Sequence, residues 1–176
     1  MAKIEITILE SANGVKFGSD AETIHKAFGD DFKNYKDKKL TESDNEFLIK
    51  VAERMSEISG RPVTDFTKYL NEDSEFDNDP CDYYPYCMID YDDNDKFSAI
   101  EIYSDKKTNL IVNGIDCSDF NIETLKSLAD DFVWDKEETS WTSLKKEICI
   151  YCPEDDKTVE CVLFGCSGYY NFLDEQ

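Results

Sequence analysis

Residues 71–95 contain ten carboxylates and no lysine or arginine, and this run of negative charge constrains the fold more than any other feature. Carboxylates spaced so closely repel one another in a folded domain, which predicts that the segment serves a purpose. Four tyrosines lie among these acids, namely Tyr83, Tyr84, Tyr86 and Tyr91. An acidic surface rich in tyrosine suits the binding of a basic partner and repels nucleic acid.

The composition indicates a globular protein in spite of this charge. The chain has 176 residues, of which 40% are hydrophobic and 13% aromatic, which is enough for one domain with a substantial core. Its 40 acidic and 19 basic residues give a net charge of −21, which argues against binding to nucleic acid or to an anionic membrane. Isoleucines alternate with charged residues at the N-terminus, which is not the pattern of a signal peptide. We therefore expect a cytoplasmic protein, and the oligomeric state stays unknown.

Hydrophobic periodicity predicts both strands and helices. Ile4, Ile6 and Ile8 alternate with polar residues, as in a half-buried strand. Asn13-Gly14 and Asn113-Gly114 each predict a turn. Capping-box patterns predict helices over residues 19–28 and 43–58, and apolar spacing predicts a short one near 122–128. Further strands are predicted in a hairpin over 87–103 and near 110–112, 133–134, 147–152, 158–164 and 169–173. The expected fold class is α+β, with helices packed on one face of an antiparallel sheet.

An internal repeat suggests that the single domain, residues 1–176, contains two related helix-hairpin halves. Gly14 recurs as Gly114, and the sequence Asp-Asp-Phe at 30–32 recurs at 130–132. The halves would be residues 1–104 and 105–176, with an insertion over about 36–86 in the first. The alternative is that two ordinary runs share common residue types. An insertion that the repeated unit does not need is a reasonable place for function.

The insertion contains the residues that we expect to bind the partner. Its carboxylates would attract a basic surface, and its tyrosines would supply contact area. The predicted partner-binding residues are Glu72, Asp73, Glu75, Asp77, Asp79, Asp82, Tyr83, Tyr84 and Tyr86.

Two motifs resemble metal sites without matching them. Residues 90–101 place oxygen ligands as an EF-hand loop does, but Asp95 occupies the position that requires glycine. A coincidental hairpin tip is therefore favoured over calcium binding. Cys149 and Cys152, with Cys161 and Cys166, could form a zinc site, but residues three apart on a strand face opposite sides. Free, packed thiols are the favoured interpretation, and no metal or cofactor is expected.

Catalysis is not indicated. The lone His25 lies within the predicted first helix, without a nucleophile motif beside it. Paired carboxylates are so numerous that choosing two as acid and base would be arbitrary. We expect a protein that is not an enzyme.

Several segments resemble immunity proteins of bacterial polymorphic and contact-dependent toxin systems. The resemblance rests on residues 14–19 with Ile24, Phe28 and Gly29, on a hairpin with Tyr91-Asp92 and Lys96 followed by Ile-Glu-Ile-Tyr, and on the closing residues 168–170. The repeated helix-hairpin unit is also similar to the modules of β-lactamase-inhibitor-like proteins. Ser19-Asp20 departs from the usual helix start of these proteins, and the insertion has no counterpart. The resemblance implies a small cytosolic protein that neutralises a toxin by tight binding, with no binding residue carried over.

Three functional hypotheses follow. The first is an immunity protein that binds a basic toxin, such as a nuclease or ribonuclease, because an acidic inhibitor associates rapidly with a basic enzyme. The second is a DNA mimic that inhibits a nuclease or a phage-defence complex. The third is a calcium-responsive binding module.

Overall fold

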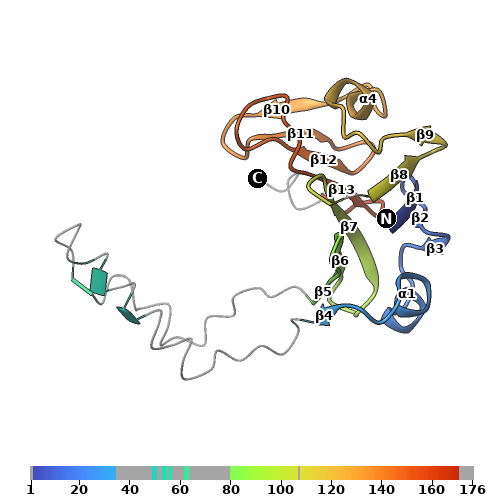
Figure 1. The fold of residues 1–176 in the computed structure, drawn as a ribbon, viewed down its shortest axis with the longest axis horizontal. Helices are drawn as coiled ribbons and strands as arrows, with labels where there is room; N and C mark the ends of the chain where they lie inside the picture. The colour runs from blue at the N-terminus through green and yellow to red at the C-terminus, as the bar shows by residue number, and fades with distance from the viewer. Residues whose placement is uncertain are drawn as a thin grey trace. The chain divides into compact units, whose positions relative to one another are not determined.

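The computed structural model describes residues 2–34, 49–50, 53–54, 56, 62–63, 80–106 and 108–170. The chain divides into two compact units. The first unit comprises Met1–Asn34 together with Asp79–Gln176, and the second comprises Tyr35–Asn78. The described strands of the first unit form two sheets (Figure 1).

A five-stranded sheet pairs the N-terminal strand with a strand from the middle of the chain, and these two strands run parallel. Its order is β3-β2-β1-β8-β9, and β1 runs parallel to β8 while the other pairs are antiparallel. Alternation along β1 and β8 buries Ile4, Ile6, Leu110 and Val112 on one side. The strands are β1 (Ala2–Thr7), β2 (Ser11–Ala12), β3 (Val15–Lys16), β8 (Thr108–Val112) and β9 (Ile115–Asp116).

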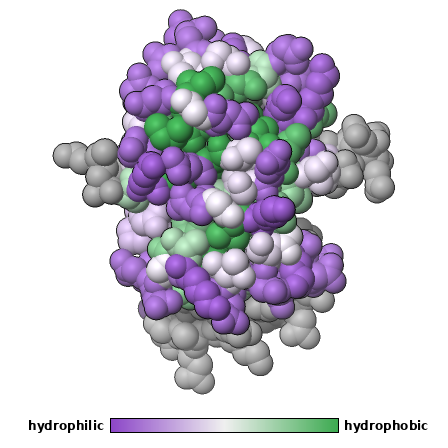
Figure 2. Space-filling view, turned by 90° about the vertical axis from the view of Figure 1, so that its right-hand side faces the viewer, coloured by the Kyte–Doolittle hydropathy of each residue, from purple (hydrophilic) through white to green (hydrophobic). Residues whose placement is uncertain are grey.

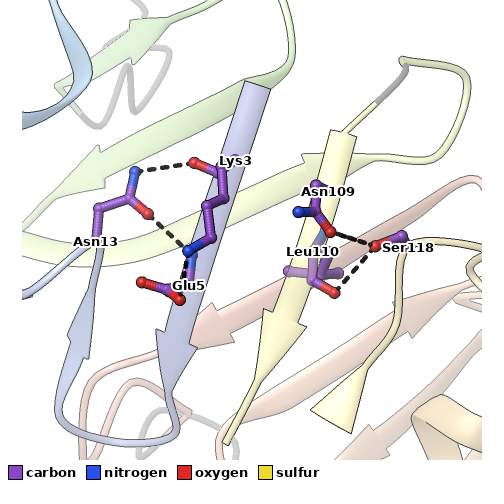
Figure 3. Close-up of polar contacts among 6 residues, drawn as sticks. All are labelled: Lys3, Glu5, Asn13, Asn109, Leu110 and Ser118. Atoms are coloured by element: carbon purple, nitrogen blue, oxygen red, sulfur yellow. Dashed lines mark hydrogen bonds and ion pairs between the residues drawn. The ribbon is translucent and has the colours of Figure 1, made fainter. Parts of the chain in front are cut away.

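Polar side chains secure the β2–β3 and β8–β9 turns of this sheet. Asn13 and Asn113 both adopt a φ of 48°, and each precedes a glycine with positive φ, as tight hairpins require. The Asn13 Oδ1 atom accepts a hydrogen bond from the Glu5 amide at 2.8 Å (Figure 3). On the β8 side, the Ser118 hydroxyl donates to Oδ1 of Asn109 at 2.9 Å. The two predicted Asn-Gly turns are therefore confirmed.

The second sheet has eight strands in the order β10-β11-β12-β13-β7-β6-β5-β4, and every neighbouring pair is antiparallel. Strands β7 and β13 pair at the centre of the sheet. From β7 the chain order runs backwards to β4 at one edge, and from β13 it runs backwards to β10 at the other edge. The strands are β4 (Lys33–Asn34), β5 (Cys81–Tyr83), β6 (Cys87–Tyr91), β7 (Phe97–Tyr103), β10 (Val133–Asp135), β11 (Ser140–Ser143), β12 (Ile148–Tyr151) and β13 (Cys161–Gly165).

One face of the eight-stranded sheet forms the core of the first unit. Alternate residues of the central strands point to this face and have at most 1% of their surface exposed. They are Cys87, Ile89, Ile100, Ile102, Ile148, Ile150, Val162 and Phe164. The intervening residues of the same strands point to the opposite face, which we call the open face.

The helices of the first unit are short. Helix α1 (Ala21–Phe28) buries Ile24 and Phe28 and ends at Gly29, while α4 (Ile122–Lys126) buries Leu125. The Asn121 side chain caps α4 by accepting from two backbone amides. Among the described residues, no helix combines the length and apolar character needed to cross a membrane. Figure 2 shows the side bearing β3, β9 and α1, where hydrophilic side chains surround hydrophobic ones.

The predicted α+β fold class is wrong, because the described chain is mostly β. Two short helices do not form a layer over an eight-stranded sheet. The predicted helix-hairpin unit is also too small, since each side of the β7–β13 pair contains four strands. Sequence periodicity missed β11 because its four residues, Ser-Trp-Thr-Ser, are too few to establish an alternation. The helix expected over 43–58 lies largely outside the described residues.

Candidate protein-binding face

The predicted partner-binding residues divide into two groups. Glu72, Asp73, Glu75, Asp77 and Asp79 lie outside the described residues. The remaining four lie on or just after β5, which pairs with β4 and β6 in the eight-stranded sheet. Because successive residues of a strand face opposite sides, these four cannot share one surface.

Asp82 is turned into the core. It has no exposed surface, and its Oδ2 atom lies 2.7 Å from Nε2 of His25. The Tyr91 hydroxyl donates to the same oxygen at 2.5 Å. The His25 ring stacks on Phe32 with ring centres 4.1 Å apart. These contacts join α1 to β5 and β6, so Asp82 has a structural position rather than a place on a contact surface.

Tyr84 and Tyr86 connect the sheet to the end of α1. The Tyr84 hydroxyl donates to the Gly29 carbonyl at 3.1 Å, and that of Tyr86 donates to the Phe28 carbonyl at 3.3 Å. Tyr84 is 4% exposed, and burial raises the pKa of both phenols above their ordinary value. Tyr84 is thus a core residue, and Tyr86 is half-buried beside it.

Tyr83 lies on the open face and keeps 39% of its surface exposed. Strand pairing places it opposite Met88, which in turn lies opposite Glu101 on β7. Burial, with added repulsion from Cys81, Asp90 and Glu101, raises the pKa of the Tyr83 phenol. Among the predicted residues that the structure describes, Tyr83 is therefore the most accessible to a partner.

The register extends this row of open-face residues across all eight strands, beginning with Lys33 on β4, which lies opposite Tyr83. Glu101 pairs with Leu163, Leu163 with Cys149, Cys149 with Thr142, and Thr142 with Val133. The same side of the sheet also carries Asp90, Tyr103, Asp135 and Tyr151, by their alternation with the row. Seven strands, β5 to β7 and β10 to β13, contain no lysine or arginine at any position.

The open face is amphipathic and acidic. Val133 is 68% exposed and Tyr151 36% exposed, so both side chains can be reached from solvent. Asp90, Glu101 and Asp135 supply carboxylates between the tyrosines. Tyrosine provides rigid contact area, and carboxylates on strands that contain no lysine or arginine attract basic groups. Lys33 places a cation at the β4 end of the row, beside Tyr83.

A short segment, residues 166–170, continues from β13 and is fixed by Glu147. The carboxylate of Glu147 accepts from the amides of Gly168 at 2.8 Å and Tyr170 at 3.0 Å. The Tyr169 hydroxyl donates to Oδ2 of Asp90 at 3.3 Å. Tyr169 also packs against Gly165, where an added Cβ atom would lie 2.6 Å from the tyrosine Cβ. Tyr169 therefore extends over the open face.

Two hollows lie beside this segment, and Tyr170 lines both. The first hollow, which we call the β10–β12 cleft, has a volume of about 720 Å³. It is lined by Asp131, Val133, Asp135, Glu138, Ser140, Thr142, Leu144, Cys149 and Tyr170. The second, of about 560 Å³, is lined by Tyr91, Asp92, Asp93, Ser98, Leu163, Gly168, Tyr169 and Tyr170.

The geometry of the metal-like motifs suits structural roles. The Oδ1 atom of Asp92 accepts from the amides of Asn94 and Lys96, both at 2.9 Å, so it is engaged within its own hairpin turn. The Lys96 ammonium forms an ion pair with Asp20. Cys149 lines the β10–β12 cleft, whereas Cys152 is buried. In the part of the chain that the structure describes, no group of three or more His, Cys, Asp or Glu side chains is placed to hold a metal.

Sequence reasoning missed most of the open face. Glu101, Tyr103, Val133 and Tyr151 were not among the expected residues, and they come from strands far apart in the chain. The available signal was the absence of lysine and arginine from seven strands, which becomes visible only once the strands are known. No protein-family model, curated protein or solved structure matches this chain.

Proposed function

We propose that this protein is a non-enzymatic binding protein that holds a basic protein partner on its open face. We further propose that the partner is a toxin and that the protein acts in the cytoplasm as its immunity protein. The resemblance of residues 14–29 and 168–170 to immunity proteins supports the choice of partner. A nuclease or ribonuclease is the favoured class of toxin, because enzymes that bind phosphate backbones are basic.

The observation that carries the proposal is the composition of the open face. Tyr83, Tyr103 and Tyr151 lie there with Asp90 and Glu101, on strands without lysine or arginine. Tyrosine is enriched among residues that dominate binding energy, because its ring buries a large area at little entropic cost. The carboxylates add specificity and speed of association rather than most of the affinity.

The charge of the whole chain supports the same partner class. A net charge of −21 creates a negative field that accelerates encounter with a basic protein. At low salt such steering raises association rates to about 10⁸–10⁹ M⁻¹s⁻¹. The same field repels nucleic acid, so nucleic acid should not compete with the partner for the open face.

The test uses the protein encoded immediately upstream as the candidate partner, with binding measured by surface plasmon resonance. The double variant Tyr83→Ala, Glu101→Gln removes an exposed aromatic ring and a carboxylate from the open face. We expect its affinity to fall roughly tenfold to a hundredfold, mainly through faster dissociation. The matched control is Ile115→Ala, Glu5→Gln, which makes similar changes on exposed residues of the five-stranded sheet. If both variants bind the partner with equal affinity, the open face is not the surface that binds it.

Competition with nucleic acid separates this proposal from a DNA mimic. A mimic occupies the nucleic-acid site of its target, so duplex DNA should displace it. If the toxin binds this protein and DNA at the same time, then this protein contacts the toxin outside its nucleic-acid site. The immunity function would be contradicted by two results together: no basic toxin is encoded beside this protein, and purified basic nucleases do not bind it.

A further inference from the structure

We propose that the β10–β12 cleft binds a long cationic side chain, an arginine or a lysine, from the basic partner. This inference rests on the proposed function and assigns a specific anchor site to it. The cleft lies at one end of the open face, and strands β10, β11 and β12 supply its lining together with the adjoining turns. Its volume of about 720 Å³ lies within the roughly 300–1,000 Å³ range of protein ligand sites.

The apolar part of the cleft is unusually accessible. Val133 and Leu144 are 68% and 45% exposed, and both line it. Thr142 lies between Val133 and Cys149 in the strand register, so these side chains form a continuous surface. Methylene groups of lysine or arginine pack along such surfaces while the charged end stays near polar groups.

Carboxylates also line this cleft, and backbone amides of the adjoining turn hold one of them in place. Oδ1 of Asp135 accepts from the amides of Glu137 at 2.8 Å and Glu138 at 3.1 Å. Its Oδ2 atom has no hydrogen bond within the described chain, and the Glu138 carboxylate forms no ion pair there. Both groups remain available to an incoming cation.

A third carboxylate adds negative charge that is held in place. Asp131 accepts from the Ser143 hydroxyl at 2.5 Å and from the Lys145 amide at 3.1 Å. The Lys145 ammonium lies 3.6 Å from Asp130, which does not line the cleft, and its charge also favours the ionised form of Asp131 and offsets part of the negative charge of that carboxylate. The cleft therefore joins an apolar wall to several carboxylates.

This combination selects for length and positive charge together. A neutral apolar side chain would fill the wall but would leave carboxylates desolvated without a partner, which is costly. A short cation would reach the carboxylates without covering Val133 and Leu144. Arginine and lysine satisfy both requirements, because a chain of methylene groups separates the backbone from the charge.

The first experiment titrates the ¹⁵N-labelled protein with N-acetyl-arginine methylamide and N-acetyl-lysine methylamide, observed by NMR. We expect concentration-dependent amide shifts at Val133, Thr142 and Leu144. N-acetyl-norleucine methylamide, which has a similar stem without charge, serves as the control probe and should shift these amides far less. Equal shifts from the neutral probe, or no shifts from the cations, would overturn the inference.

The second experiment uses the double variant Asp135→Asn, Glu138→Gln, which removes charge while keeping size. We expect it to abolish the shifts caused by the cationic probes and to weaken partner binding at least tenfold. The matched control is Glu154→Gln, Asp156→Asn, an exposed pair outside the cleft. Retained probe binding by the first variant would contradict the role of these carboxylates.

The two proposals can fail separately. If Tyr83→Ala, Glu101→Gln weakens partner binding while Asp135→Asn, Glu138→Gln does not, the open face stands and the cleft is not an anchor site. If neither variant changes partner binding, the proposed function of the open face fails as well. Probe titration reports on the cleft without any partner present.

Discussion

The imidazole Nε2 atom of His25 lies 2.7 Å from the carboxylate of Asp82, although 57 positions separate the two residues in the chain. Asp82 is fully buried, and it accepts a second hydrogen bond from Tyr91. Helix α1 is thereby joined to β5 and β6, immediately beside the point where the chain leaves β4 for the second unit. Asp82 comes from the most negatively charged segment of the sequence, and this contact shows that it stabilises the fold.

Replacing His25 should destabilise the first unit. His25→Ala removes a polar partner of the buried Asp82 and the ring that stacks on Phe32. Loss of one partner of a buried polar pair costs about 3 kcal/mol, so urea unfolding should show a decrease of that order in the free energy of unfolding. Lys26→Ala, on the exposed side of the same helix, should change it by less than about 0.5 kcal/mol. Equal effects of the two substitutions would argue against the His25–Asp82 contact.

Gly165 should not tolerate a side chain. An alanine Cβ atom there would lie 2.6 Å from Cβ and 2.7 Å from Cγ of Tyr169. Gly165→Ala should therefore displace Tyr169 and lower the free energy of unfolding by about 1–3 kcal/mol, measured by thermal or urea denaturation. In the double variant Gly165→Ala, Tyr169→Gly the steric conflict is absent. Its loss of stability should be smaller than the sum of the two single losses, and simple additivity would contradict this contact.

The buried thiols should react slowly with alkylating reagents. Burial raises the pKa of Cys117 and of Cys152 to about 11, so little thiolate is present near pH 8. Mass spectrometry after brief treatment of the native protein with iodoacetamide should show these two unmodified. The half-buried Cys81, Cys149 and Cys166 should be labelled before these two, and urea should make all sites reactive. Early labelling of Cys117 in the native state would contradict its buried position.

Asp131 should stabilise the fold at neutral pH and lose this effect in acid. Burial opposes ionisation, but hydrogen bonds from Ser143 and Lys145 outweigh it and lower the pKa of the carboxyl below 3.8. A depressed native pKa gives stability that is present above the ordinary value and is lost as pH falls through the lower one. Asp131→Asn should thus flatten the dependence of unfolding free energy on pH below about 4. A profile identical to that of the wild type would show that Asp131 does not contribute.

Local sequence patterns predicted many elements of the first unit. The Asn-Gly pairs at 13–14 and 113–114 form turns because both residues tolerate positive φ. Ile24, Phe28 and Gly29 define the buried side and the end of α1, as expected from helical spacing. Its beginning was predicted less well, since Asp20 rather than Ser19 is the N-cap and forms no side-chain capping bond.

Fold class could not be obtained from the same patterns. Strand β11 contains four residues, and β2, β3, β4 and β9 contain two each, which is too short for alternation to exceed chance. Their stability depends on pairing with neighbours, and β13 reaches β7 across about 60 positions of sequence. Helical patterns, by contrast, depend on contacts three or four residues apart and are visible locally. Local patterns therefore predicted α1 and α4 but not the number of short strands around them in the described chain.

The candidate site shows the same division. Composition by itself supports the proposal of a basic partner, because a net charge of −21 attracts basic proteins in any fold. Only the tertiary structure decided which acids and tyrosines are available. Pairing of β5 with β4 and β6 turns Asp82 inward to His25 and Tyr83 outward. The register then aligns Glu101, Cys149 and Val133 with Tyr83, since residues distant in sequence share a face only when strands pair.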